Sequence, residues 1–100
     1  MTINAVAENN ICTLEIEGRI DTLTAPQLEK AFNEYAGSCD KMIFDLSKVD
    51  YISSAGLRVI VVAHRGMEKK GGLVLRNLSL NVENIINMTG FNRSLHIEKT

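Results

Sequence analysis

Apolar and polar residues alternate in the first part of the chain. From residue 12 to residue 17 every second position is apolar and the positions between are polar, which predicts a half-buried strand over residues 11–17 that Gly18 ends. The apolar side of this strand consists of Cys12, Leu14 and Ile16. Asn9-Asn10 has the composition of a hairpin turn, so residues 3–8 are expected to form an antiparallel partner strand.

The spacing of apolar residues then changes to that of a helix. The apolar residues at this spacing are Leu28, Ala31, Phe32 and Tyr35. We expect Thr24 to cap the helix, with Gln27 completing a capping box. Pro26 is tolerated in the first turn, and Gly37 is expected to end the helix.

Short apolar runs and two further helical segments complete the pattern. Residues 41–46 are nearly all apolar, which predicts an interior strand covered on both faces. Residues 55–70 form the clearest helix, with a serine cap in front and Gly71-Gly72 as its stop. The remaining elements are two strands and a short helix, at residues 73–78, 95–97 and 82–88. Strands separated by helices need crossover connections, so the sequence predicts an α/β domain with a partly parallel sheet.

Composition narrows the class of protein. The 100 residues fit one domain, residues 1–100, and the formal net charge of -1 does not favour a nucleic acid or an anionic membrane as partner. The apolar run 59–63 is too short for a membrane span, and the first residues lack the pattern of a signal peptide, so a cytoplasmic location is expected. Cys12 and Cys39 are expected to be free thiols.

Motifs of catalysis and cofactor binding are missing from the sequence. His64 and His96 have no metal-ligand spacing to each other or to a cysteine, so we expect no metal. The glycines match neither a Walker loop nor a dinucleotide fingerprint, and Ser54 lacks the nucleophile elbow of a hydrolase. We therefore expect no catalytic residues and no cofactor. An enzymatic or nucleotide-binding role remains the least supported alternative, and binding of labelled ATP or GTP would test it.

Ser54 stands out because of its place in the chain. It lies in a strand-to-helix loop, immediately before the long helix whose first N–H groups have no partners within the helix. One interpretation is a simple N-cap, which contributes about 1 kcal/mol. The other is a phosphoacceptor, because the helix dipole and the free N–H groups hold a phosphate well.

Several segments together resemble the STAS domain of anti-sigma factor antagonists. The strongest are residues 45–47 (DLS) and, after a short loop, residues 52–57 (ISSAGL). Supporting segments are residues 18–21 with the helix start at Thr24-Ala25, residues 71–73 and residues 88–91. The resemblance implies a single α/β domain with a mixed four- to five-stranded sheet and helices packed mainly on one face.

The resemblance also implies the site. Ser54 matches the serine that is phosphorylated in the family, and Ser53 stands where many members carry an Asp, so Ser53 is the alternative acceptor. The resemblance implies that Asp21 helps to shape the phosphorylation site, although Asp21 fits equally well as a residue that orders its own turn. Asp45 is also expected to shape this site, because the alternating topology can bring its loop to the same sheet edge as Ser54. The expected partner contacts are Ser53, Ser54, Gly56, Leu57 and Arg58, with a place in the core as the alternative for Leu57.

By the same resemblance the protein works through partner switching. The unphosphorylated form binds an anti-sigma factor that is a serine kinase of the GHKL type, which frees a sigma factor, and phosphorylation reverses this. A metal-dependent serine phosphatase resets the switch. The protein is then a substrate and ligand rather than an enzyme, and a monomer or a weak dimer. The alternative is a constitutive STAS adaptor, for example in a lipid-transport ABC system, in which Ser54 is not phosphorylated.

Overall fold

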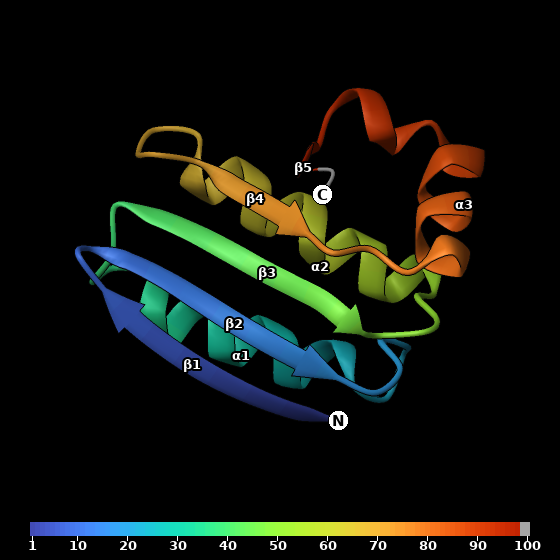
Figure 1. The fold of residues 1–100 in the computed structure, drawn as a ribbon, viewed down its shortest axis with the longest axis horizontal. Coiled ribbons are helices and arrows are strands. Elements are labelled where there is room, and N and C mark those ends of the chain that lie inside the picture. Colours follow the sequence, from blue (N-terminus) through green and yellow to red (C-terminus); the bar gives the residue numbers. More distant parts are fainter. Residues whose placement is uncertain (99–100) are drawn as a thin grey trace.

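A five-stranded sheet with the order β1-β2-β3-β4-β5 forms the frame of the molecule (Figure 1). The computed structural model describes residues 1–98 of the chain. The strands are β1 (Thr2–Glu8), β2 (Ile11–Glu17), β3 (Lys41–Lys48), β4 (Leu73–Arg76) and β5 (His96–Glu98). β1 is antiparallel to β2, and every later pair of neighbours is parallel, so the predicted mixed sheet is confirmed.

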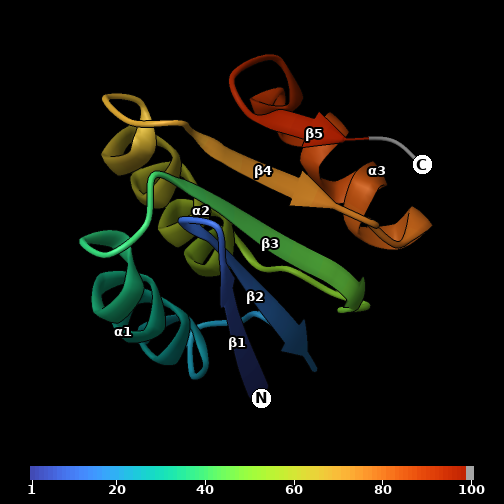
Figure 2. The ribbon, with the colours of Figure 1, turned by 60° about the vertical axis from the view of Figure 1, so that its left-hand side comes forward.

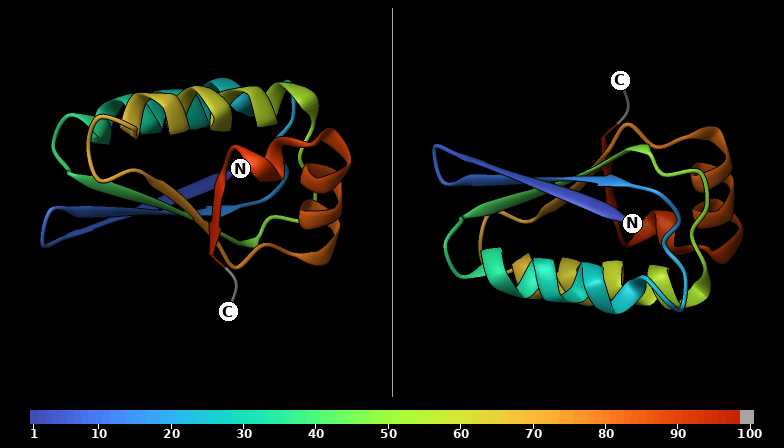
Figure 3. Two further views of the ribbon diagram at one scale, coloured as in Figure 1. Left: turned by 90° about the horizontal axis from the view of Figure 1, so that it is seen from above. Right: turned by 90° about the horizontal axis from the view of Figure 1, so that it is seen from below.

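Three helices connect the parallel strands. They are α1 (Ala25–Ala36), α2 (Ser54–Met67) and α3 (Leu80–Thr89), and a 3-10 turn (Phe91–Arg93) follows α3. α1 and α2 lie side by side on one face of the sheet, while α3 lies beyond the carboxyl end of β4 (Figures 2 and 3). Helices therefore cover mainly one face, as expected. Within residues 1–98 no helix has the length and apolar character needed to cross a membrane.

The core lies between the sheet and the pair α1 and α2. Because side chains alternate along a strand, Leu14, Phe44 and Leu75 all point to the helices and are almost completely buried. On the other face, Ile43 and Val74 are also buried, although neither belongs to this core. β3 is an interior strand, as predicted, but α1 and α2 cover only one of its faces, and on the other face Lys41 and Asp45 are half-buried whereas Ile43 is buried.

The ends of several elements differ from the prediction. β3 continues to Lys48, and β4 ends at Arg76 because Asn77 adopts a positive φ of 60°. α2 ends at Met67, before the predicted Lys70, because the chain turns there and the N–H of Gly72 donates to the Met67 carbonyl at 3.1 Å. These local turns were not visible in the apolar pattern.

Two buried cysteines sit where β2 and the start of β3 meet. Both are free thiols, as predicted. The Cys39 thiol donates to the Tyr35 carbonyl at 3.2 Å. Burial, together with the contact to Cys12, raises the pKa of Cys39 to about 11, so the thiol stays protonated and unreactive at neutral pH.

Candidate phosphoacceptor and partner-binding site

Two adjacent serines begin α2, and the structure gives them different tasks. Ser53 is the N-cap: its backbone is extended and its hydroxyl oxygen accepts the N–H of Gly56 at 3.2 Å. Ser54 is the first helical residue and is exposed. Among residues 1–98 its hydroxyl has no hydrogen-bond partner. The capping role considered for Ser54 therefore belongs to Ser53, and the hydroxyl of Ser54 is free for chemistry.

Main-chain hydrogen bonds hold the loop before α2 against the segment that follows β2. The N–H of Ile20 donates to the Tyr51 carbonyl at 3.0 Å, and the N–H of Ser53 donates to the Ile20 carbonyl at 2.8 Å. These bonds create a one-residue parallel bridge between Ile20 and Ile52. The two loops thus continue the pairing of β2 with β3, and the N-terminal end of α2 has a fixed position.

Gly56 permits this close approach. A Cβ atom at Gly56 would lie 2.5 Å from Cγ2 and 2.8 Å from the carbonyl oxygen of Ile20. Gly56 is buried, and Leu57 is 2% exposed within the core. Their burial argues against the expected direct contact of Gly56 and Leu57 with a partner. Both residues shape the start of α2 from the inside, which leaves Ser53, Ser54 and Arg58 as contact candidates.

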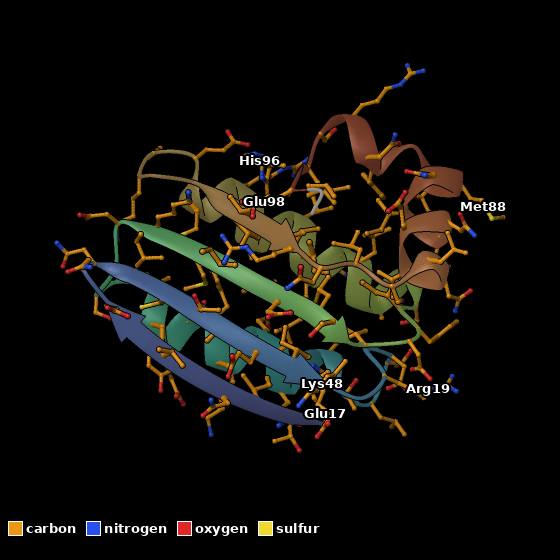
Figure 4. The ribbon with its side chains drawn as sticks, in the orientation of Figure 1. Glu17, Arg19, Lys48, Met88, His96 and Glu98 are labelled. Atoms are coloured by element: carbon orange, nitrogen blue, oxygen red, sulfur yellow. The ribbon has the colours of Figure 1, made fainter. Side chains whose placement is uncertain are left out.

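Two further contacts support the loop from its outer sides. The guanidinium of Arg19 lies over the ring of Tyr51, 4.6 Å from its centroid, and Figure 4 shows Arg19 at the carboxyl ends of β2 and β3. On the other side, the Asn81 side chain in α3 donates to the Asp50 carbonyl at 2.6 Å. Neither contact is predictable from the sequence, because a cation–π pair and an amide-to-carbonyl bond between distant segments leave no local pattern.

Asp21 orders the turn before α1. Its Oδ1 accepts the N–H groups of Leu23 and Thr24 at 3.0 and 3.1 Å. The Thr24 N–H bond, the other hydrogen bonds of the turn and the charge of Arg19 hold the pKa of Asp21 below its ordinary value. Asp21 therefore fits the turn-ordering alternative, and its links to the loop before α2 are indirect, through the adjacent Ile20 bridge and through Arg19, which lies 3.7 Å from its Oδ2.

The predicted capping box at α1 is wrong. The Thr24 hydroxyl donates to the Arg19 carbonyl at 2.7 Å and accepts the N–H of Asp21 at 2.9 Å, so it is not available to the helix. The Gln27 side chain donates to the Met1 carbonyl instead. The competing bonds within the turn account for the difference.

Asp45 lies apart from the loop before α2, residues 49–53. It follows Phe44 in β3 and therefore points to the sheet face opposite the helices. Its Oδ1 accepts the N–H of Ser47 at 3.0 Å and lies 3.5 Å from the side-chain nitrogen of Asn77. The expectation that Asp45 shapes the phosphorylation site is not supported, because strand alternation turns it away from α2.

A shallow groove lies beside Ser54, between the first halves of α1 and α2. Its lining residues are Thr22, Ala25, Pro26, Glu29, Ala55, Arg58, Val59 and Val62. Arg58 and Val62 are exposed, and Leu23 next to the groove is 89% exposed. A free hydroxyl, a cation and apolar side chains therefore share one surface, which suits protein binding.

Comparison with known proteins adds relatives to this geometry. The anti-sigma-F factor antagonist RsfB of Mycobacterium tuberculosis is 33% identical over 79 residues, which cover 76% of this chain and 65% of RsfB. The anti-sigma-B factor antagonist of Bacillus subtilis is 34% identical over 84 residues, covering 83% of this chain and 76% of that protein. The match to RsfB thus spans slightly less than two thirds of its length.

A solved structure and a family match extend the comparison to almost the whole chain. The crystal structure of an anti-sigma factor antagonist from Mycobacterium paratuberculosis has a TM-score of 0.89 and 25% identity, covering 99% of this chain and 86% of that one. The STAS domain family matches residues 2–100. The similarity thus includes the sheet, the helices and the start of α2. From its sequence and its fold, the chain belongs to the STAS domain family.

Proposed function

We propose that this protein is an anti-sigma factor antagonist that works by partner switching. Its unphosphorylated form binds an anti-sigma factor that is also a serine kinase of the GHKL type, and a sigma factor is released. Phosphorylation of Ser54 ends the binding, and a metal-dependent serine phosphatase restores it. The names of the relatives support the class of protein. The exposed, unbonded hydroxyl of Ser54 at the start of α2 is the observation that carries the proposal.

The two serines are unequal as acceptors. Transfer to Ser53 would occupy the oxygen that caps Gly56 and would add a phosphate to a half-buried side chain. Transfer to Ser54 disturbs no hydrogen bond among the described residues. The phosphate would lie at the positive end of a 14-residue helix, near Arg58 one turn along. The proposal therefore assigns Ser54 as the acceptor and Ser53 as its neighbour that fixes the helix start.

The physical effect of the phosphate falls on the partner rather than on the fold. A phosphoserine carries a charge of roughly -1.5 to -2 at neutral pH. An acidic group of the partner at about 4 Å would be repelled by about 4 kcal/mol per charge pair at an effective dielectric near 20. Such a repulsion corresponds to a several-hundredfold loss of affinity or more. A single modification is therefore sufficient to exchange partners.

The test incubates wild type, Ser54→Ala and Ser53→Ala with ATP and a lysate of the source organism. The intact mass of each protein and the masses of its fragments are then measured. We expect one phosphoryl group in wild type and in Ser53→Ala, and none in Ser54→Ala. The kinase that carries out the transfer can then be captured as the anti-sigma partner. If an active kinase modifies no version, the phosphoswitch is wrong. The protein would then be a constitutive STAS adaptor, which uses the same surface without modification.

A further inference from the structure

The two edges of the sheet differ in length and composition. β5 has three residues, including His96 and Glu98, which Figure 4 shows at the upper edge of the sheet. β1 has seven residues, and its one charged side chain is Glu8 at the last position. β1 contains no proline or lysine and pairs with β2 without a shift in register. Long sheet edges are usually protected by such features, so β1 offers unprotected N–H and C=O groups to another strand.

A shallow groove with apolar and polar lining residues follows this edge on the helix side of the sheet. Its floor consists of Ile3, Ala5, Ala31 and Tyr35, and its rim of Gln27, Lys30 and Glu34. The floor residues are partly buried hydrophobic side chains that pack against the core. The right-hand view of Figure 3 shows β1 and α1 bordering the same side of the molecule. A strand added to β1 would insert alternate side chains into this groove.

The charged residues on the rim, Lys30 and Glu34, are complementary to the same two residues of a second copy. α1 connects the parallel strands β2 and β3, so it runs opposite to β2 and in the direction of β1. Antiparallel pairing of two β1 strands across a twofold axis therefore also places two α1 helices antiparallel. With the axis level with residue 32 of α1, Lys30 of each copy faces Glu34 of the other copy. Both side chains are exposed, and neither takes part in an ion pair within residues 1–98.

We propose that a second copy of this chain binds to the β1 edge. The two sheets then join into one continuous sheet with the two antiparallel β1 strands at its centre, and the two α1 helices pack against each other across the twofold axis. This inference does not depend on phosphorylation. The groove beside Ser54 uses Pro26 and Glu29 on a different side of α1, so both acceptor sites stay accessible. The dimer presents two acceptor serines at once, and an anti-sigma factor with two subunits would bind it with increased avidity.

Charge reversal provides the test. The full chain is studied by sedimentation equilibrium over the micromolar to millimolar range, as wild type, Lys30→Glu, Glu34→Lys and the double variant Lys30→Glu/Glu34→Lys. Each single reversal places like charges opposite each other, so we expect a dimer dissociation constant raised roughly tenfold. The double variant restores opposite charges and is expected to restore dimerisation. Glu29→Lys, on the other flank of α1, is the matched control and is expected to leave the dissociation constant unchanged.

Hydrogen exchange locates the interface independently of the charges. We expect the outward N–H groups of β1 to exchange more slowly at high protein concentration, while those of β5 do not change. A wild-type chain that stays monomeric throughout the concentration range would overturn the proposal. The proposal would also be overturned if the chain dimerises but neither Lys30→Glu nor Glu34→Lys changes the dissociation constant and the N–H groups of β1 gain no protection. The two copies would then meet at another surface. Neither result would bear on phosphorylation of Ser54.

Discussion

α2 and α3 begin in the same way, yet only the start of α2 fits the proposed phosphorylation switch. Ser53 accepts the N–H of Gly56 at 3.2 Å, and Ser79 accepts the N–H of Val82 at the same distance. Both caps have extended backbones, and in both helices the residue after the cap is exposed. The comparison shows that a serine cap with an exposed successor does not by itself identify a phosphorylation site.

The difference lies in what surrounds each cap. The third residue after the cap is glycine in α2, which allows the helix to approach Ile20, and a buried valine in α3. The first turn of α3 contains the acidic Glu83, whereas that of α2 has no acidic residue. A phosphate at the start of α3 would therefore face a negative charge, and one at the start of α2 would not.

The largest expected contrast comes from giving α3 the serine pair of α2. In the variant Leu80→Ser, residues 79 and 80 repeat the sequence of residues 53 and 54. This variant keeps Glu83 in the first turn of α3, and its helix start still lacks a close approach like that of Gly56 to Ile20. We therefore expect no phosphorylation at residue 80 by a kinase that modifies Ser54. Fragment mass on Leu80→Ser and on Leu80→Ser/Ser54→Ala measures this. Full modification at residue 80 would show that the cap sequence alone suffices.

Next in size is the effect of filling the space at Gly56. We expect Gly56→Ala to lower the free energy of unfolding by about 1–3 kcal/mol, because its Cβ overlaps atoms of Ile20 and the helix start must shift. Gly37→Ala is the matched control, since a Cβ there meets nothing within 4 Å. Urea denaturation compares the two. Equal stability of both variants would mean that the approach of α2 to Ile20 is not tight.

Removing each cap separates stability from function. We expect Ser53→Ala and Ser79→Ala each to cost about 1 kcal/mol of unfolding free energy, because one N–H loses its side-chain acceptor in both. Only Ser53→Ala is expected to slow phosphorylation of Ser54 as well. Denaturation and the initial rate of phosphoryl transfer are measured on the same samples. An equal slowing in both variants would contradict a local role of Ser53.

The smallest expected effect is the pH dependence at Asp21. Its pKa is lower in the folded protein than in the unfolded chain, where it is about 3.9, so the ionised form stabilises the fold. This contribution is complete above pH 5 and is lost as the pH falls through the folded pKa. The stability difference between wild type and Asp21→Asn is therefore expected to be larger at neutral pH than near pH 3. Urea denaturation at both pH values checks this, and a difference that grows in acid would contradict it.

The sequence predicted the elements better than the contacts between them. The alternation in β2 and the helical spacing in α1 follow directly from burial on one face, so both elements were found close to their observed bounds. Asp45 was misplaced because it was expected in a loop at the sheet edge near Ser54, whereas β3 continues to Lys48 and strand alternation turns Asp45 away from α2. The Arg19–Tyr51 and Asn81–Asp50 contacts join segments that only the folded chain brings together.

The Ile20–Ile52 bridge has a consequence for the thermodynamics of docking. A loop that becomes ordered only in a complex loses about 1–2 kcal/mol of backbone conformational entropy per residue. Here main-chain bonds already fix Ile20, Tyr51 and Ser53 in the free protein. Most of this entropy is therefore lost during folding and not during association. A partner that reads the start of α2 meets a preformed surface, and its binding enthalpy is not offset by ordering of this loop.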